Sequence, residues 1–151
     1  MTDLEKILLT SATTVIGGVI VYVLGQLLSK FVIEPIHELK KAIGETRFSL
    51  AFHAPIIHTP IGRTKERSDE AYAAIMKSSC DLLAKSEAVA LYRFIPARFL
   101  PLAKDVSRAA VDLRALSTYL HETDNKAAGH IEEVNVRVKS VENLLRLKPL
   151  T

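Results

Sequence analysis

Residues 7–29 read ILLTSATTVIGGVIVYVLGQLLS, a run of 23 residues without a charged side chain. As an α-helix at 1.5 Å per residue this run is about 34 Å long, and a hydrocarbon core is about 30 Å thick. A cleaved signal peptide has a positive N-terminal region and a shorter apolar core, whereas Asp3 and Glu5 make the preceding residues acidic. The run therefore predicts a membrane-spanning helix within an anchor of residues 1–30.

The charges on either side of this run predict its orientation. Only Lys6 precedes it, and the nearest basic residues after it are Lys30, Lys40, Lys41 and Arg47. Because positively charged flanks stay in the cytoplasm, we expect the N-terminus outside and residues 31–151 inside. Cys80, the one cysteine, suits a reducing compartment. The predicted location is the bacterial inner membrane, crossed once.

Small and polar side chains recur along one face of this helix. The seam consists of Ser11, Thr14, Gly18, Tyr22, Gly25 and Ser29. Small residues at helical spacing let backbones approach closely in lipid, so the seam favours self-association, and hydroxyls from several copies would line a narrow pore. The alternative is that glycine, serine and threonine are simply common in membrane helices.

The remainder of the chain predicts an all-α fold. Apolar residues there recur at intervals of three and four, which is typical of amphipathic helices, and no stretch alternates as a strand does. The predicted helices cover about 35–52, 65–92, 102–121 and 127–147. Residues 54–62, with two prolines and a glycine, are predicted to be a loop. The expected architecture is an N-terminal transmembrane helix followed by a cytoplasmic antiparallel bundle of about four helices.

The last predicted helix carries apolar side chains beyond a single stripe. Its stripe consists of Ile131, Val134, Val138, Val141 and Leu145. Val136, Leu144 and Leu147 lie off this stripe, so burying them requires a wider interface. Two occupants of that interface stay open, namely another helix of the same chain and a neighbouring copy in a homo-oligomer.

Residues 92–101 read YRFIPARFLP and connect the second predicted helix to the third. In an up-and-down bundle that starts at the membrane, this connection returns to the level of the lipid headgroups. Aromatic rings and cations both favour that level. We therefore predict a membrane interface made by Arg93, Phe94, Arg98 and Phe99. An apolar loop packed under its own bundle is the alternative.

The opposite end of the bundle is predicted to face the cytosol. It carries Arg63, Lys65 and Arg67, which are candidate contacts for an anionic ligand or a cytosolic partner. Ordinary solvated charge is the alternative. The 20 basic and 17 acidic residues give a net charge of +3 without a dense basic stripe, and tryptophan is absent. A nucleic-acid surface is therefore not predicted.

Motifs for catalysis are sparse. The sequence has no glycine-rich phosphate loop, no nucleophile elbow and no HExxH motif, and its scattered histidines predict no metal site and no cofactor. The exception is Arg114 and His121, whose Arg-x6-His spacing resembles the motif of HEPN ribonucleases. An arginine there would hold a phosphate while the histidine moves a proton, with Ser117 and Thr118 on the same face. Ala115 departs from that motif, which usually has a polar residue after the arginine, and a solvated polar stripe is the alternative.

Residues 34–45 read EPIHELKKAIGE, which resembles the juxtamembrane signature E-P-I-x-E…I-G-E of a family of small bacterial single-pass membrane proteins. Similar features continue at residues 51–54 (AFHA), at Leu100-Pro101 and at Leu116-Ser117. The resemblance covers most of the chain and implies a membrane helix followed by further helices; it supplies no established activity and no catalytic residue to carry over. In architecture alone, the chain is also similar to pore-forming membrane effectors of bacterial antiviral CRISPR systems, in which a single helix anchors a helical bundle that assembles into a ring.

These observations lead to one predicted function and two alternatives. The prediction is a non-enzymatic, membrane-anchored helical protein that oligomerises in the inner membrane and acts as a membrane effector, a gated pore or permeabiliser in antiphage defence. The first alternative is a membrane tether or scaffold for a cytosolic partner. The second is a HEPN-like membrane-bound ribonuclease that uses Arg114 and His121. The expected partners are membrane lipid, further copies of the chain, and a cytosolic protein or ligand at the distal loops.

Overall fold

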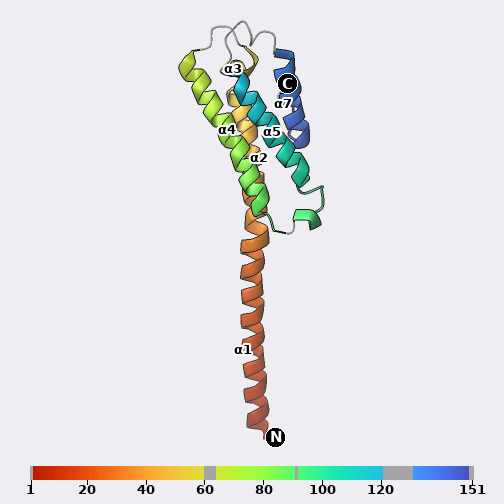
Figure 1. Ribbon diagram of the computed structural model, residues 1–151. Helices are drawn as coiled ribbons and strands as arrows, with labels where there is room; N and C mark the ends of the chain where they lie inside the picture. The colour runs from red at the N-terminus through yellow and green to blue at the C-terminus, as the bar shows by residue number, and fades with distance from the viewer. Residues whose placement is uncertain (1, 60–63, 91, 121–130, 150–151) are drawn as a thin grey trace.

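The computed structural model describes residues 2–59, 64–90, 92–120 and 131–149, and every regular element in these ranges is a helix (Figure 1). The elements are α1 (Asp3–Leu28), the π-helical turn η1 (Ser29–Ile33), α2 (Glu34–Phe52), α3 (Ala54–His58), α4 (Lys65–Ala88), the 3₁₀ turn η2 (Tyr92–Phe94), α5 (Ala103–Tyr119) and α7 (Ile131–Leu144). The prediction of an all-α chain with a long apolar N-terminal helix followed by a helical bundle is confirmed.

The first three elements form one unbroken helix of 50 residues, Asp3–Phe52. Pro35 lies in the first turn of α2, inside this helix. Proline has no N–H, and its ring crowds the carbonyl four residues earlier, here that of Phe31. The chain widens into η1 directly before the proline, where the Glu34 N–H donates to the Ser29 carbonyl. The anchor boundary predicted at residue 30 therefore falls inside a π turn of a continuous helix.

Among the described residues, the bundle is built mainly by α2, α4, α5 and α7, which run in alternating directions (Figure 1). α2 leads away from α1, α4 returns, α5 leads away again and α7 returns. α4 packs against α2 and α5, and α5 also packs against α7. The short α3 contacts α2, α4 and α7 at the end of the bundle far from α1. This order places residues 92–101 at the end of the bundle that lies nearest to α1 (Figure 1). We call this end of the bundle the α1 end.

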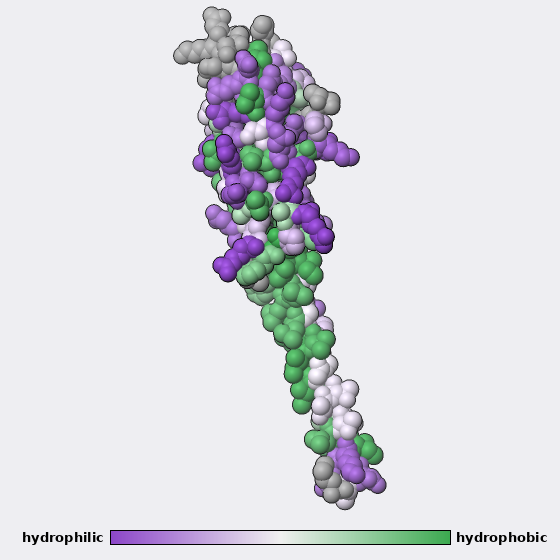
Figure 2. Space-filling model, turned by 90° about the vertical axis from the view of Figure 1, so that its right-hand side faces the viewer, coloured by the Kyte–Doolittle hydropathy of each residue, from purple (hydrophilic) through white to green (hydrophobic). Residues whose placement is uncertain are grey.

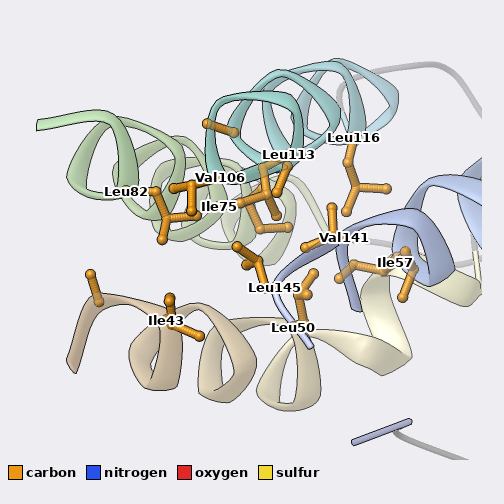
Figure 3. Packing of buried hydrophobic residues seen from close by; sticks show 14 of the residues in the cluster. Ile43, Leu50, Ile57, Ile75, Leu82, Val106, Leu113, Leu116, Val141 and Leu145 are labelled. Atoms are coloured by element: carbon orange, nitrogen blue, oxygen red, sulfur yellow. The ribbon is translucent and has the colours of Figure 1, made fainter. Parts of the chain in front are cut away.

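The core lies between these helices (Figure 3). Its fully buried large side chains include Leu39, Leu50, Ile75, Leu82, Leu113 and Leu116. α4 and α5 meet through small residues, since Ala71, Ala109 and Ala110 are completely buried, and small side chains at the contact allow helix axes to lie close together. The Ser79 Oγ donates a hydrogen bond of 2.7 Å to the Ala110 carbonyl across this contact. This hydrogen bond pairs a polar side chain that is completely buried.

Three predicted boundaries are wrong, and one of them is the end of the last helix, which lies at Leu144 and not at Leu147. The stretch predicted as a loop contains α3, because Pro55 stands in the first turn of a helix, where its missing N–H is not needed, and because Ile57 is buried in the core. α4 ends at Ala88 and does not reach Tyr92, because Val89 leaves the helical conformation (φ −74°, ψ 101°) and buries its side chain. The predicted start of the last helix, at residues 127–130, lies outside the described residues.

Candidate functional site

α1 is uncovered along its whole length. None of its 26 residues is buried, and Figure 2 shows its apolar surface extending from a hydrophilic bundle. The fourteen large apolar side chains that α1 exposes are between 47% and 74% accessible. Covering them would contribute on the order of 20 kcal/mol, more than the roughly 5–15 kcal/mol by which a typical domain is stable. The helix is long and apolar enough to cross a membrane.

The seam residues lie on α1 and, in the case of Ser29, in η1. The Thr14 hydroxyl donates to the Thr10 carbonyl at 2.9 Å, so the helix itself satisfies this donor, as an apolar surrounding requires. A Cβ atom added at Gly18 or Gly25 would meet nothing within 4 Å. The seam is therefore open to the close approach of another helix.

Two residues, Tyr92 and Leu100, hold the connection of residues 92–101 against the bundle. The Tyr92 hydroxyl donates to the Pro101 carbonyl at 2.8 Å, and burial, with a contribution from the Asp105 carboxylate, raises the pKa of Tyr92. The hydroxyl therefore keeps the proton that it donates. Leu100 is inserted into the core, with 2% of its surface exposed. The two anchors hold the rest of the connection at the α1 end.

The two phenylalanine rings of this connection stay outside the bundle. Phe94 is 66% exposed and Phe99 is 52% exposed. The Arg93 Cζ lies 4.7 Å from the centroid of the Phe94 ring, and the Arg98 Cζ lies 4.7 Å from that of Phe99. The alternative of a loop packed under its own bundle holds for Tyr92, Ile95 and Leu100, which lie against the core, but not for Phe94 and Phe99. Each exposed ring instead carries a guanidinium, a combination that suits a headgroup layer.

The stripe predicted on the last helix is mostly internal. Val134, Val138, Val141 and Leu145 are buried in the bundle, whereas Ile131 is 36% exposed. Polar contacts hold α7 against α5: Asp112 accepts from Arg137 at 3.2 Å and from the Ser140 hydroxyl at 2.7 Å. Hydrogen bonding to Glu133 raises the pKa of Arg137. The four buried residues are occupied within one chain and are not surface for a second copy.

The proposed Arg-x6-His face is not one surface. Arg114 and Thr118 are exposed, but Ser117 is fully buried and its hydroxyl donates to the Arg114 carbonyl at 2.7 Å. Ser117 therefore belongs to the core, because its position on α5 is next to Leu113 and Leu116. The prediction that it shares a polar face with Arg114 is wrong. His121 lies outside the described residues.

The distal end of the bundle holds the other predicted contacts. Lys65 and Arg67 are exposed at the start of α4, and Arg63 lies outside the described residues. Nearby, the His58 Nδ1 lies 2.7 Å from the Asn135 Oδ1, which joins α3 to α7, and both residues line a cavity of about 360 Å³. Among the described residues no group of His, Cys, Asp and Glu is placed to hold a metal ion.

Two features of the structure were not predicted from the sequence, an ion pair between α2 and α4 and a basic cavity. The Lys85 Nζ lies 2.7 Å from the Glu38 Oε2 and joins α4 to α2; hydrogen bonding to the ammonium lowers the pKa of Glu38. A basic cavity at the α1 end combines Lys40, Arg98 and Arg146. Within each group the residues are at least 47 positions apart in the chain. No local spacing in the sequence therefore predicts either group.

Comparison with known proteins yields no matching family model, no matching curated protein and no matching solved structure. The resemblance of residues 34–45 to a family of membrane proteins therefore stays a prediction. Fold and site together define a helical bundle that carries a long, uncovered apolar helix and an exposed pair of arginine–phenylalanine contacts at the same end.

Proposed function

We propose that the chain is a membrane-anchored effector that self-associates through its apolar helix and permeabilises the inner membrane under control of its bundle. The observation that carries this proposal is the unbroken helix Asp3–Phe52. Its first half is uncovered, and its second half contributes Leu39 and Leu50 to the core. In this proposal α1 spans the bilayer, the N-terminus is outside, and the bundle lies in the cytoplasm.

Continuity of the helix supports a gated effector over a tether. A tether functions with a flexible linker, because it only limits distance. A gate requires that movement of the bundle reach the membrane segment. Since α2 is held in the core at Leu39 and Leu50, a tilt or rotation of the bundle is transmitted to α1 through η1 without an intervening loop.

The seam supports self-association. Gly18 and Gly25 offer open approach, and close contact between backbones is how helices associate in lipid, where apolar attraction between helices is absent. Several copies that met along the seam would bring their hydroxyl groups together inside an apolar surround. By architectural likeness to pore-forming antiviral effectors, the response that we propose is antiphage defence.

The test is membrane depolarisation in bacteria that express the full chain, measured with a membrane-potential dye. We expect depolarisation by the wild type and its loss when Gly18 and Gly25 are both replaced by leucine. Gly17→Leu is the matched control, since it adds the same side chain at an equally open glycine about 100° around the helix. Membrane fractionation shows whether each variant is still inserted.

Three outcomes would contradict the proposal. A wild type that never depolarises the membrane under an inducing stress or phage challenge excludes an effector that permeabilises it. Equal depolarisation by the wild type and the double leucine variant excludes the seam as the surface through which copies associate. A detergent-solubilised mass that corresponds to one copy excludes any pore built from several chains, and leaves the tether.

A further inference from the structure

A small basic cavity lies at the α1 end of the bundle, beside the exposed rings. It is an open hollow of about 230 Å³ at the surface, formed by α2, by residues 92–101 and by the end of α7. The basic residues that line it are Lys40, Arg98 and Arg146. We call this hollow the basic pocket. Its remaining described lining is Ile43, Phe99, Leu100, Pro101 and Leu145. No carboxylate is among these lining residues.

The basic pocket is a built arrangement, because its walls are tied together. The Arg146 guanidinium donates a hydrogen bond to the Ala97 carbonyl, which joins the end of α7 to the connection. Arg98 is held over the Phe99 ring at 4.7 Å. Leu100, directly after that ring, is buried in the core. Arg98 and Arg146 therefore line the same hollow from separate segments.

The backbone at Arg146 adds a second, independent observation. Its φ is 56°, the left-handed conformation. It ends α7 in a Schellman motif, in which the Leu147 N–H donates to the Glu142 carbonyl at 2.8 Å and the Arg146 N–H donates to the Asn143 carbonyl at 3.2 Å. Glycine is the usual residue at this position because it adopts that conformation without steric penalty. Arg146 nevertheless takes this position and lines the hollow.

Lys40, Arg98 and Arg146 are exposed residues that line one open hollow, and a bound anion would offset their like charges. Guanidinium groups match the geometry of phosphate oxygens, with which they form paired, charge-assisted hydrogen bonds. The cavity is smaller than the roughly 300–1,000 Å³ of pockets for drug-sized ligands. Its size and charge therefore favour a single phosphate group over an extended ligand.

The position of the pocket favours a lipid as the source of that phosphate. Exposed apolar residues continue along the first helix to Ile33, and Lys40 follows seven residues later, about 10 Å along the helix. The headgroup layer extends roughly 5–8 Å beyond the hydrocarbon on each side, and the length of a lysine or arginine side chain covers the remainder. Phe99, 52% exposed, stands beside the cations where an acyl chain would begin.

We propose that the basic pocket binds the phosphate of an anionic phospholipid headgroup. This inference rests on the membrane anchoring in the proposed function, but not on pore formation. Binding at this point would link α2, the connection and the end of α7 to one lipid molecule, at the end of the bundle where the apolar helix begins.

The experiment titrates the detergent-solubilised full chain with phosphatidylglycerol and counts bound lipids by native mass spectrometry. Phosphatidylcholine with the same acyl chains and inorganic phosphate are the parallel probes. We expect a phosphatidylglycerol affinity at least tenfold above that for phosphatidylcholine, and a tenfold or greater loss in Arg98→Gln and in Arg146→Gln. Arg108→Gln, which removes an exposed arginine of α5 away from the cavity, should stay within twofold of wild type.

Two kinds of result overturn the inference. Inorganic phosphate that displaces phosphatidylglycerol makes the pocket a free-phosphate site. Equal retention of both lipids, or wild-type retention in both arginine variants, removes the pocket from lipid binding. Arg146→Gln removes the hydrogen bond to the Ala97 carbonyl and could disturb folding, whereas Arg98→Gln keeps this bond. The Arg98→Gln result therefore decides the test if Arg146→Gln does not fold. Lipid binding without depolarisation in cells would refute the effector and leave the pocket standing.

Discussion

Serine at Phe94 and Phe99 should release the bundle from anionic vesicles. The perturbation is best made in a chain that starts at Glu34, which lacks the apolar helix. This shorter chain keeps the described core, because α1 contributes no buried residue and the core cluster begins at Leu39. Its binding to a membrane then depends on surface contacts, of which the exposed connection of residues 92–101 is the predicted one.

The size of the effect follows from exposure. Phe94 and Phe99 are 66% and 52% exposed, and a fully buried ring contributes about 1.5–3 kcal/mol, so each ring offers about 1–2 kcal/mol. Two arginines add about 1 kcal/mol each at an anionic surface. A total of about 4–6 kcal/mol corresponds to a dissociation constant between millimolar and tens of micromolar. Serine at both rings removes about 2–4 kcal/mol, a loss of roughly 30- to 700-fold.

Vesicle co-sedimentation measures this loss, with circular dichroism to verify folding. Binding of the unsubstituted shorter chain should weaken as salt rises, because screening acts on the arginine contribution. The matched control replaces Val111 and Val136 with serine, since both are 61% exposed but lie on α5 and α7. A shorter chain that ignores anionic vesicles at low salt refutes the predicted orientation of the bundle. Binding that survives serine at both rings assigns the contact to another surface.

Two further outcomes test the bundle itself. Leu113→Ala should lower the free energy of unfolding by about 2–5 kcal/mol, because Leu113 is completely buried between the helices (Figure 3); chemical denaturation measures this, with the exposed Val111→Ala expected within about 0.5 kcal/mol of wild type. Glu38→Gln should remove an acid-sensitive part of stability, because hydrogen bonding to Lys85 lowers the pKa of Glu38 below its ordinary 4.5. A group with a depressed folded pKa stabilises the fold above its unfolded pKa, and that contribution disappears as pH falls through the folded pKa. Denaturation at pH 7 and pH 3 measures it, and an equal difference between wild type and Glu38→Gln at both values contradicts the linkage.

Helices and their inward faces were predictable because their signal is local. In α5 and at the residue that caps it, the spacing of Val106, Leu113, Leu116 and Leu120 marks one face, and all four are buried. The uncharged run of residues 7–29 likewise predicts α1 without reference to the rest of the chain. For such segments, the hydrophobic period alone determines both the helix and the side that packs.

Features that depend on contacts between elements were not predictable in this way. Ser117 is polar, but its position on α5 carries it into the core, where the helix's own carbonyl satisfies its hydroxyl. Ile57 makes α3 a docked helix instead of a loop. Arg146 gives no local sign of its role, since neither its left-handed backbone nor its neighbours Lys40 and Arg98 are visible in sequence order. Each case depends on which elements meet.

The junction at Pro35 shows how such a difference alters the functional argument. A proline near the start of a periodic segment predicts that a new helix begins there, and thus that a separable anchor precedes a bundle. In the structure the π turn η1 directly precedes the proline and accommodates it, and the chain continues as one helix. A broken junction would make the apolar helix a passive anchor for any partner. Under the proposed function, an unbroken junction transmits movement of α2 to α1, which a gated effector needs and a tether does not.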